Sequence, residues 1–168
     1  MTISADDAAT FKGLMADMPS AVTVITAWDA SGRPVGATLS AVMSLSMDPP
    51  MMVAAFDARS ATLAVLRTGA PFLIHVLGAK QETLAGSFAG KGAGKFAGLD
   101  WQPGLGGLPQ LAGVVGLIAC EVSTIVPGGD HKLVLGTVSA LAHPREVEPL
   151  VYHRRTLRAM YIPDALVA

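Results

Sequence analysis

The chain has 168 residues, of which 51% are hydrophobic and 15% are charged, and its formal net charge is −1. This composition excludes a disordered chain, since disorder needs few apolar residues and many charges, and an average domain has about 25% charged residues. A membrane-spanning helix needs about 20 consecutive apolar residues, whereas the longest apolar stretch, Leu111 to Cys120, is shorter and contains two glycines. We therefore expect a soluble chain that covers part of its surface with a second copy of itself.

Charge and cysteine content limit the possible partners and location. The densest basic cluster is Arg154, Arg155 and Arg158, which is too small to suggest a nucleic-acid surface. The single cysteine, Cys120, cannot form an intramolecular disulfide, and no signal peptide is recognisable, so a cytoplasmic location is expected. The four histidines and Cys120 lie too far apart in the sequence to suggest a metal site.

The N-terminal third predicts one helix followed by three strands. Apolar residues at helical spacing (Phe11, Leu14, Met15 and Met18) predict an amphipathic helix that Ser4 and Asp7 begin with a capping box. Residues 21–28, 35–45 and 51–56 are rich in apolar and β-branched residues, as strands are. The third of these strands is wholly apolar, so we expect it to be buried on both faces.

The remaining chain predicts two short helices and three more strands. The helices are residues 60–67, with Ser60 as N-cap, and residues 80–88. The strands are residues 72–77, 113–126 and 132–143; residues 91–107 are expected to be a glycine-rich loop and the tail 149–168 to be partly helical. His75 lies in an apolar strand and is expected to be a hydrogen-bonded core histidine.

These elements predict a mainly β fold. No helix of crossover length links successive strands, which argues against a parallel sheet. We expect a six-stranded antiparallel split or closed β-barrel of Greek-key type, with small helices around it, as one domain spanning residues 1–168.

Three stretches have the residue types that a nucleotide site needs. Thr38, Ser40, Ser44 and Ser46 recur at even spacing, so one strand face could offer hydroxyls to a flavin, or these could be ordinary strand residues facing solvent. Arg59 and Ser60 open a helix and could bind an anion, or could be a plain cap with a solvated arginine. Asp130 next to His131 could fix the tautomer of the imidazole, or could belong to a simple hairpin turn.

Taken in order, the motifs resemble those of the flavin reductase family that shares the FMN-binding split barrel. The matching stretches cover nearly the whole chain. They are Val22-Thr-Val-Ile-Thr26, Gly36-Ala-Thr38, Ser44-Leu-Ser-Met-Asp-Pro-Pro50, Arg59-Ser60, Phe72-Leu-Ile-His-Val-Leu77, Gln81, Leu84-Ala85, Phe88-Ala89, Lys95-Phe96, Gly107-Leu-Pro109, Cys120, Gly129-Asp-His131, Gly136-Thr-Val138 and Pro149-Leu-Val-Tyr152.

The resemblance implies a role for each motif. The segment from Thr38 to Ser44 would lie along the flavin, Arg59 and Ser60 near its phosphate, and His131 near the nicotinamide. The residues expected to bind cofactors are Thr38, Leu39, Ser40, Ala41, Ser44, Asp57, Arg59, Ser60, Phe88, Ala89, Lys95, Phe96, Asp130, Tyr152 and Arg154. His131 is the expected catalytic residue.

The tail departs from the family pattern, which commonly reads Tyr-x-Arg-Gly-x-Tyr. Here the glycine is replaced by Arg155 and the second aromatic residue by Leu157. This departure leaves nicotinamide stacking and the choice between NADH and NADPH open. Arg155 could meet a 2′-phosphate or could be solvated.

The resemblance implies a homodimeric NAD(P)H:flavin oxidoreductase that uses FMN or FAD and supplies a monooxygenase with reduced flavin. Two other functions stay open at this point. The chain could be a split-barrel FMN-binding protein or electron carrier that does not react with NAD(P)H. It could also be an interaction protein that kept the fold and lost the cofactor.

Overall fold

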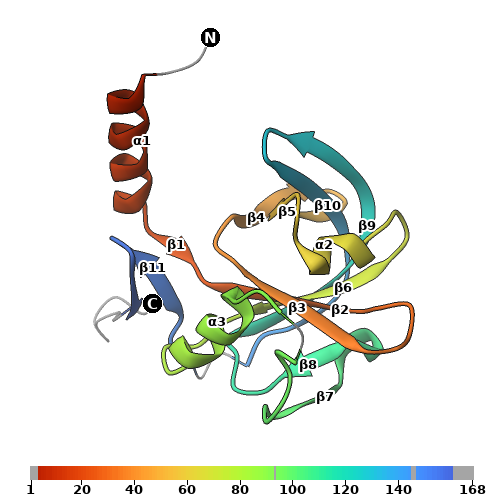
Figure 1. Ribbon diagram of the computed structural model, residues 1–168. Coiled ribbons are helices and arrows are strands. Elements are labelled where there is room, and N and C mark those ends of the chain that lie inside the picture. The colour runs from red at the N-terminus through yellow and green to blue at the C-terminus, as the bar shows by residue number, and fades with distance from the viewer. Residues whose placement is uncertain (1–3, 93, 145–146, 161–168) are drawn as a thin grey trace.

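The computed structural model describes residues 4–92, 94–144 and 147–160 and shows a mainly β, antiparallel architecture. Seven strands form one sheet in the order β3-β2-β6-β9-β10-β5-β4, as Figure 1 shows. They are β2 (Thr23–Trp28), β3 (Pro34–Leu39), β4 (Val42–Met47), β5 (Pro50–Asp57), β6 (Pro71–Val76), β9 (Gly116–Gly128) and β10 (His131–Ala142). The antiparallel, mainly β fold is confirmed.

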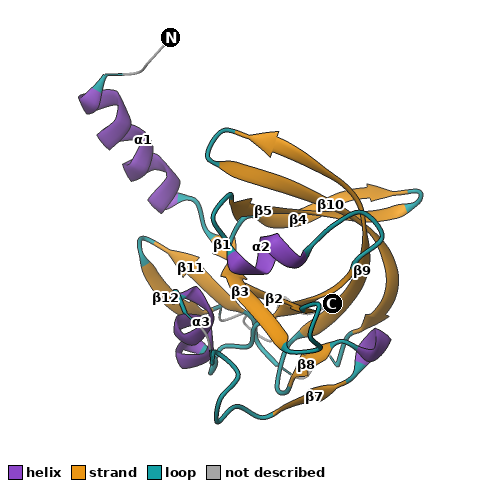
Figure 2. Cartoon of the chain, turned by 45° about the vertical axis from the view of Figure 1, so that its right-hand side comes forward, coloured by secondary structure: helices purple, strands orange, loops and turns teal. Residues whose placement is uncertain are grey.

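The expected number of six strands is wrong, and the cause is a break in the second one. The stretch 35–45 divides at Ser40 and Ala41 into β3 and β4, which occupy opposite edges of the sheet. The Ala55 amide donates to the Ala41 carbonyl over 2.9 Å, so β5 still binds the backbone at the break. Because two residues join the edge strands, the sheet must curve round to bring its edges together there (Figure 2).

Smaller β elements replace two segments that were expected to be irregular or helical. The tail forms a hairpin of β11 (Leu150–His153) and β12 (Thr156–Ala159), to which β1 (Ser20–Ala21) adds a third strand. The expected loop 91–107 contains β7 (Trp101–Pro103), which pairs with β8 (Pro109–Leu111), and a 3₁₀ turn at Leu105–Gly107. Residues 161–168 of the predicted tail lie outside the described residues.

The three predicted helices are present as α1 (Ala5–Asp17), α2 (Ala61–Val65) and α3 (Glu82–Ala89). The predicted capping box of α1 is confirmed, since the Asp7 amide donates to Ser4 Oγ over 3.1 Å and the Asp7 carboxylate accepts from the Ser4 amide. No residue of α1 is buried, and the helix stands away from the sheet (Figure 1). Its apolar stripe is therefore exposed.

The core lies on both faces of the central strands. In β6, Leu73 packs into one hydrophobic cluster and Phe72 and Ile74 into another. The expectation that the third strand is buried on both faces is wrong, because only Ala54 and Phe56 of β5 are buried. Its partner β4 lies at the sheet edge, which leaves the first half of β5 partly exposed.

His75 is fully buried, and its predicted structural role is confirmed. Its Nε2 accepts from the Leu111 amide over 3.1 Å, so Nδ1 carries the proton and donates to the Val24 carbonyl over 3.0 Å. Burial lowers the pKa of His75 to about 4, which keeps the ring neutral. Within the described residues, no helix is long and apolar enough to cross a membrane.

Candidate functional site

A groove of about 960 Å³ runs along β3 and brings most of the predicted site residues together. Its other walls are the end of β5, the start of α2, the end of α3 with the loop that follows, and the start of β10. Predicted residues that line it are Thr38, Leu39, Ser40, Ala41, Asp57, Arg59, Ser60, Phe88, Ala89, Lys95, Phe96 and His131. A smaller cavity of about 450 Å³, between the turn after β2 and the end of α2, contains none of them.

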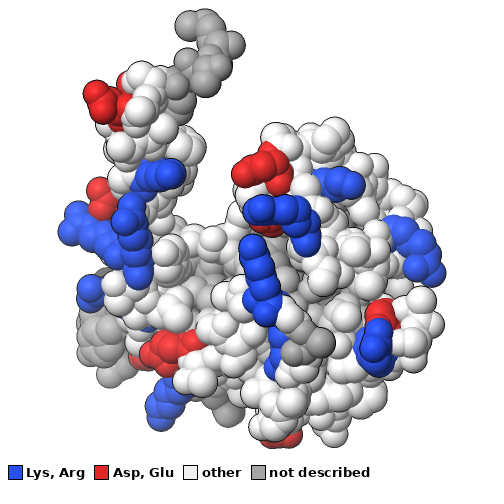
Figure 3. All heavy atoms as spheres, viewed as in Figure 1, with Lys and Arg blue, Asp and Glu red and all other residues white. Residues whose placement is uncertain are grey.

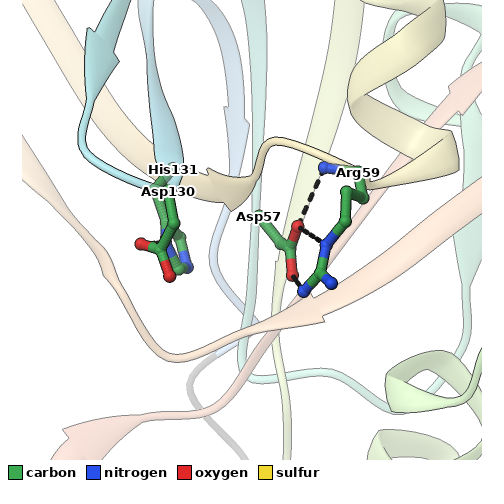
Figure 4. A network of polar contacts seen from close by, with 4 residues as sticks. All are labelled: Asp57, Arg59, Asp130 and His131. Carbon is green, nitrogen blue, oxygen red and sulfur yellow. Dashed lines mark hydrogen bonds and ion pairs between the residues drawn. The ribbon is translucent and has the colours of Figure 1, made fainter.

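Arg59 is held at the groove by the carboxylate that ends β5. Its Nε donates to Asp57 Oδ1 over 3.0 Å and its Nη2 donates to Oδ2 over 2.7 Å (Figure 4). These bonds and a third from the Arg59 backbone amide hold the pKa of Asp57 well below its usual range. The pair fixes the guanidinium geometry and leaves Nη1 available to a ligand.

His131 begins β10, directly opposite Asp57 in the neighbouring strand. Its Nδ1 lies 2.7 Å from Asp130 Oδ1, and this hydrogen bond lowers the pKa of Asp130 (Figure 4). The Asp130 carbonyl accepts from the Ala58 amide over 3.0 Å, which ties this turn to the segment before α2. The structure therefore places an oriented imidazole close to the Asp57–Arg59 pair.

The predicted row of four hydroxyls is not formed. Ser44 and Ser46 lie on β4, beyond the break and on either side of a register shift, and they do not line the groove. Thr38 does line it, but its hydroxyl donates to the Ala85 carbonyl over 2.6 Å. Thr38 thus holds α3 against β3 and offers a ligand only a lone pair, while Ser40 remains at the groove wall.

Lys95 also joins α3 to β3. Its Nζ donates to the carbonyls of Phe88, over 2.8 Å, and Gly36, over 3.1 Å, and burial lowers its pKa. No carboxylate among the described residues lies within ion-pair distance of this ammonium. Phe88 and Phe96 pack edge to face, with 4.9 Å between ring centroids, and their side chains are almost wholly buried.

Tyr152 and Arg154 were expected to bind a cofactor, but neither lines the groove. Arg154 Nε donates to Asp17 Oδ1 and its backbone amide to the Ala16 carbonyl, each over 2.7 Å. The β11–β12 turn is thereby attached to the end of α1. Arg155, where the family commonly has glycine, adopts a φ of 61°.

Sequence reasoning missed the far end of the groove. Arg33 and Lys91 line it, together with Asp29 in the turn between β2 and β3. Basic side chains gather across the middle of the face shown in Figure 3. No motif in the sequence indicates that Arg33 shares a groove with Arg59.

Residues 15–161 of the chain match the flavin reductase like domain family. The chain belongs to this family. The resemblance read from the motifs and the enzyme class that it implied, an oxidoreductase, are therefore confirmed. In the described ranges no group of three or more His, Cys, Asp or Glu side chains is arranged as a metal site.

Relatives and solved structures agree with the family assignment. The flavin-dependent monooxygenase reductase subunit HsaB of Rhodococcus jostii (strain RHA1) is 32% identical over 86% of this chain and 73% of its own length. The NADH:riboflavin 5′-phosphate oxidoreductase of Streptomyces pristinaespiralis is 35% identical over 86% of this chain and 84% of its own. The structure of the Streptomyces globisporus C-1027 NADH:FAD oxidoreductase SgcE6, in complex with NAD and FAD fragments, has a TM-score of 0.85 at 28% identity and covers 98% of this chain and 99% of that one.

Proposed function

We propose that this flavin reductase transfers hydride from reduced nicotinamide to FMN or FAD and supplies the reduced flavin to a separate monooxygenase. The observation that carries the proposal is the groove along β3, which an oriented imidazole and an oriented guanidinium both line in a chain of this family. The relatives' names support both halves of the proposal, since one is an NADH oxidoreductase and another a monooxygenase reductase subunit.

The groove fits a flavin nucleotide in size and charge. Ligand clefts are typically about 300–1,000 Å³, and this groove of about 960 Å³ lies near the upper end. Arg59 presents its free Nη1 to a phosphate, and Lys95 adds a positive charge that no described carboxylate neutralises. Ser40 and Ala41, at the break between β3 and β4, offer hydroxyl and backbone groups for the edge of a polar ring.

The hydride chemistry belongs to the two cofactors, and a bound flavin supplies the acceptor. The residues of this chain have to bind and orient the two cofactors and to exclude water. Asp130 fixes the ring of His131, which would hold the nicotinamide carboxamide against the flavin. Asp57 holds Arg59, which would bind the phosphate, and Thr38 and Lys95 hold α3 against β3. No protein nucleophile is required.

The function is tested by following NADH and NADPH oxidation by the purified protein with FMN, FAD and riboflavin added in turn. We expect flavin-dependent oxidation, with NADH as the better donor because the relatives that name a donor use it. A flavin that binds tightly but is not reduced by either nicotinamide would instead identify a flavin-binding module. Absence of both binding and turnover would overturn the proposal.

We further propose that two copies of the chain form a dimer through α1. The apolar stripe of this helix is exposed, with 56% of Phe11, 59% of Leu14 and 61% of Met18 accessible. An isolated helix of 13 residues is only marginally stable in water, so α1 needs a surface to pack against. A second copy provides that surface and accounts for the low charge of the chain.

Light scattering after gel filtration tests the dimer. The wild-type chain should have twice the monomer mass, and Leu14→Glu should shift it toward monomer because a buried carboxylate would be unpaired. Ala9→Glu is the matched control, since Ala9 lies on the opposite side of α1 and should leave the dimer intact. A monomeric wild-type chain, or equal effects of the two variants, would contradict the arrangement.

We infer that the curved seven-stranded sheet is this chain's version of the split barrel. The inference is supported by the break at Ser40 and Ala41, because the two strands that it joins, β3 and β4, occupy the two edges of the sheet. We also infer that the chain is one domain, because the β11 strand near its end pairs with β1 near its start. The cytoplasmic location stays a prediction.

A further inference from the structure

The smaller cavity, of about 450 Å³, lies between the turn that joins β2 to β3 and the segment that joins α2 to β6. Most of the residues that line it are apolar, and they include Ala27, Trp28, Val65, Leu66, Ala70 and Pro71. Ligand clefts are typically about 300–1,000 Å³ and mostly apolar, with a few polar groups that orient the ligand. The volume and the lining therefore suit a small, largely apolar molecule.

Arg67 supplies this cavity with a positive charge. Its side chain makes no ion pair with a carboxylate of the described residues, and the backbone amides of Arg67 and Thr68 donate to no described residue. The one carboxylate that lines the cavity, Asp29, already accepts from Ser31 and Arg33, and its side chain is only 15% exposed. The cavity therefore favours an anionic ligand over a cationic one.

The same two elements form walls of both the smaller cavity and the groove. In the turn between β2 and β3, Asp29 lines both, and Arg33, which Asp29 binds, lines the groove. In α2, Val65 lines the cavity and Ala61 lines the groove. A helix rises about 1.5 Å per residue, so these two positions are only about 6 Å apart along the axis. A molecule in the cavity would therefore contact both elements that also shape the groove.

We propose that the smaller cavity is an effector site for a small aromatic carboxylate, which tightens flavin binding in the groove. The proposal concerns regulation of the flavin site, so it rests on the function proposed above. A guanidinium binds a carboxylate through two parallel hydrogen bonds, and Trp28 with the apolar residues receives the aromatic ring.

The coupling between the two sites follows from their shared walls. An effector that holds the β2–β3 turn and α2 in their groove-forming positions reduces the ordering that flavin binding otherwise has to supply. Coupling between two binding sites is reciprocal, so bound flavin should tighten effector binding by the same factor.

Calorimetric titration with benzoate in the absence of flavin tests the cavity. The wild-type chain should bind benzoate about tenfold more tightly than benzamide, which has the same ring without the charge. Arg67→Gln should weaken benzoate binding by about tenfold and leave benzamide binding unchanged, because it removes only the charge-assisted hydrogen bonds. Arg158→Gln is the matched control, since Arg158 is an exposed arginine of β12 that lines neither the cavity nor the groove.

Quenching of flavin fluorescence, with and without saturating benzoate, tests the coupling. Benzoate should raise flavin affinity by about fivefold in the wild type and in Arg158→Gln, and the same concentration should have little effect in Arg67→Gln. Benzoate should in turn bind about fivefold more tightly to the flavin-loaded chain.

Equal affinities for benzoate and benzamide, or equal losses in the two arginine variants, would overturn the effector site. A flavin affinity that benzoate leaves unchanged would also overturn it, and a lowered one would show that benzoate enters the groove instead. A chain that binds no flavin would overturn the proposed function, whereas the titrations without flavin would still test the cavity. The two failures are thus distinguishable.

Discussion

Asp57, which lines the groove, and Asp130, which precedes the groove residue His131, each orient a neighbouring basic side chain. Asp57 binds Arg59 through two side-chain hydrogen bonds, and Asp130 binds the Nδ1 side of His131. In each pair the two residues are one or two positions apart in the sequence, so the carboxylate comes from the same turn as the side chain that it orients. A hydrogen bond to Nδ1 leaves Nε2 of His131 as the nitrogen that can meet a ligand.

His131→Ala should lower the turnover of NADH oxidation by about ten- to hundredfold, because misplacement of a reacting group by about 1 Å costs rates of this size. Flavin affinity should stay nearly unchanged, since Arg59 and the β3 backbone remain in place. Steady-state kinetics at saturating flavin, together with fluorescence quenching, measure the two effects separately. An unchanged rate at saturating flavin would remove His131 from the reaction.

The junction of α3 and β3 is the element that shapes the groove. Thr38 and Lys95 bond the two elements, and Phe88 packs so closely over Gly36 that a Cβ there would lie 2.6 Å from the Phe88 ring. Only glycine allows this approach. The position of α3, and with it the groove wall, therefore depends on one residue of β3.

Gly36→Ala should destabilise the fold by about 1–3 kcal/mol, as overpacking does, and weaken flavin binding by displacing α3. Gly86→Ala is the control within α3, because nothing lies within 4 Å of its added Cβ and alanine favours a helix by about 0.5–1 kcal/mol. Urea unfolding measures the change in stability of each of the two variants. A Gly36→Ala protein as stable as the wild type would show that the junction tolerates a wider spacing.

Elements that depend on contacts between residues close in the sequence could be predicted. Features that depend on how the edges of the sheet come together could not. Ser4 and Ser60 begin helices because each cap bonds an amide three residues away. The break at Ser40 and Ala41 has no glycine or proline to mark it, and it follows from the two edges of the sheet meeting there.

The same distinction applies to the site. Arg59 could be predicted because it stands with Ser60 at the start of a helix, and His131 because it stands beside Asp130 in the sequence. Arg33 and Lys91 could not, since they are exposed basic residues of separate turns, and only the packing of α3 on β3 places both at one groove. Ser44 was expected at the site because the strand was expected to continue through it.

At the scale of the whole molecule, His75 links three strands and makes stability depend on pH. The unfolded ring has a pKa near 6.5, whereas the buried ring has a pKa of about 4. Between these values the unfolded chain binds a proton that the folded chain does not, so the free energy of unfolding falls as pH decreases from about 6.5 to about 4. The loss should reach about 3 kcal/mol.

Urea unfolding at several pH values between 4 and 7 measures this loss. His75→Gln should be less stable at pH 7 but should have a flatter dependence in this range, because its amide does not titrate. An equally steep dependence in the variant would assign the effect to other groups.

The central claim, that this chain catalyses hydride transfer from NADH to a flavin, is tested most directly by anaerobic rapid mixing. NADH is mixed with FAD in the presence and absence of the protein, and the visible absorbance of oxidised flavin is followed. We predict that the absorbance disappears many times faster with the wild-type protein than without it, and that His131→Ala slows the loss. Bleaching at the same rate with and without the protein would contradict the account.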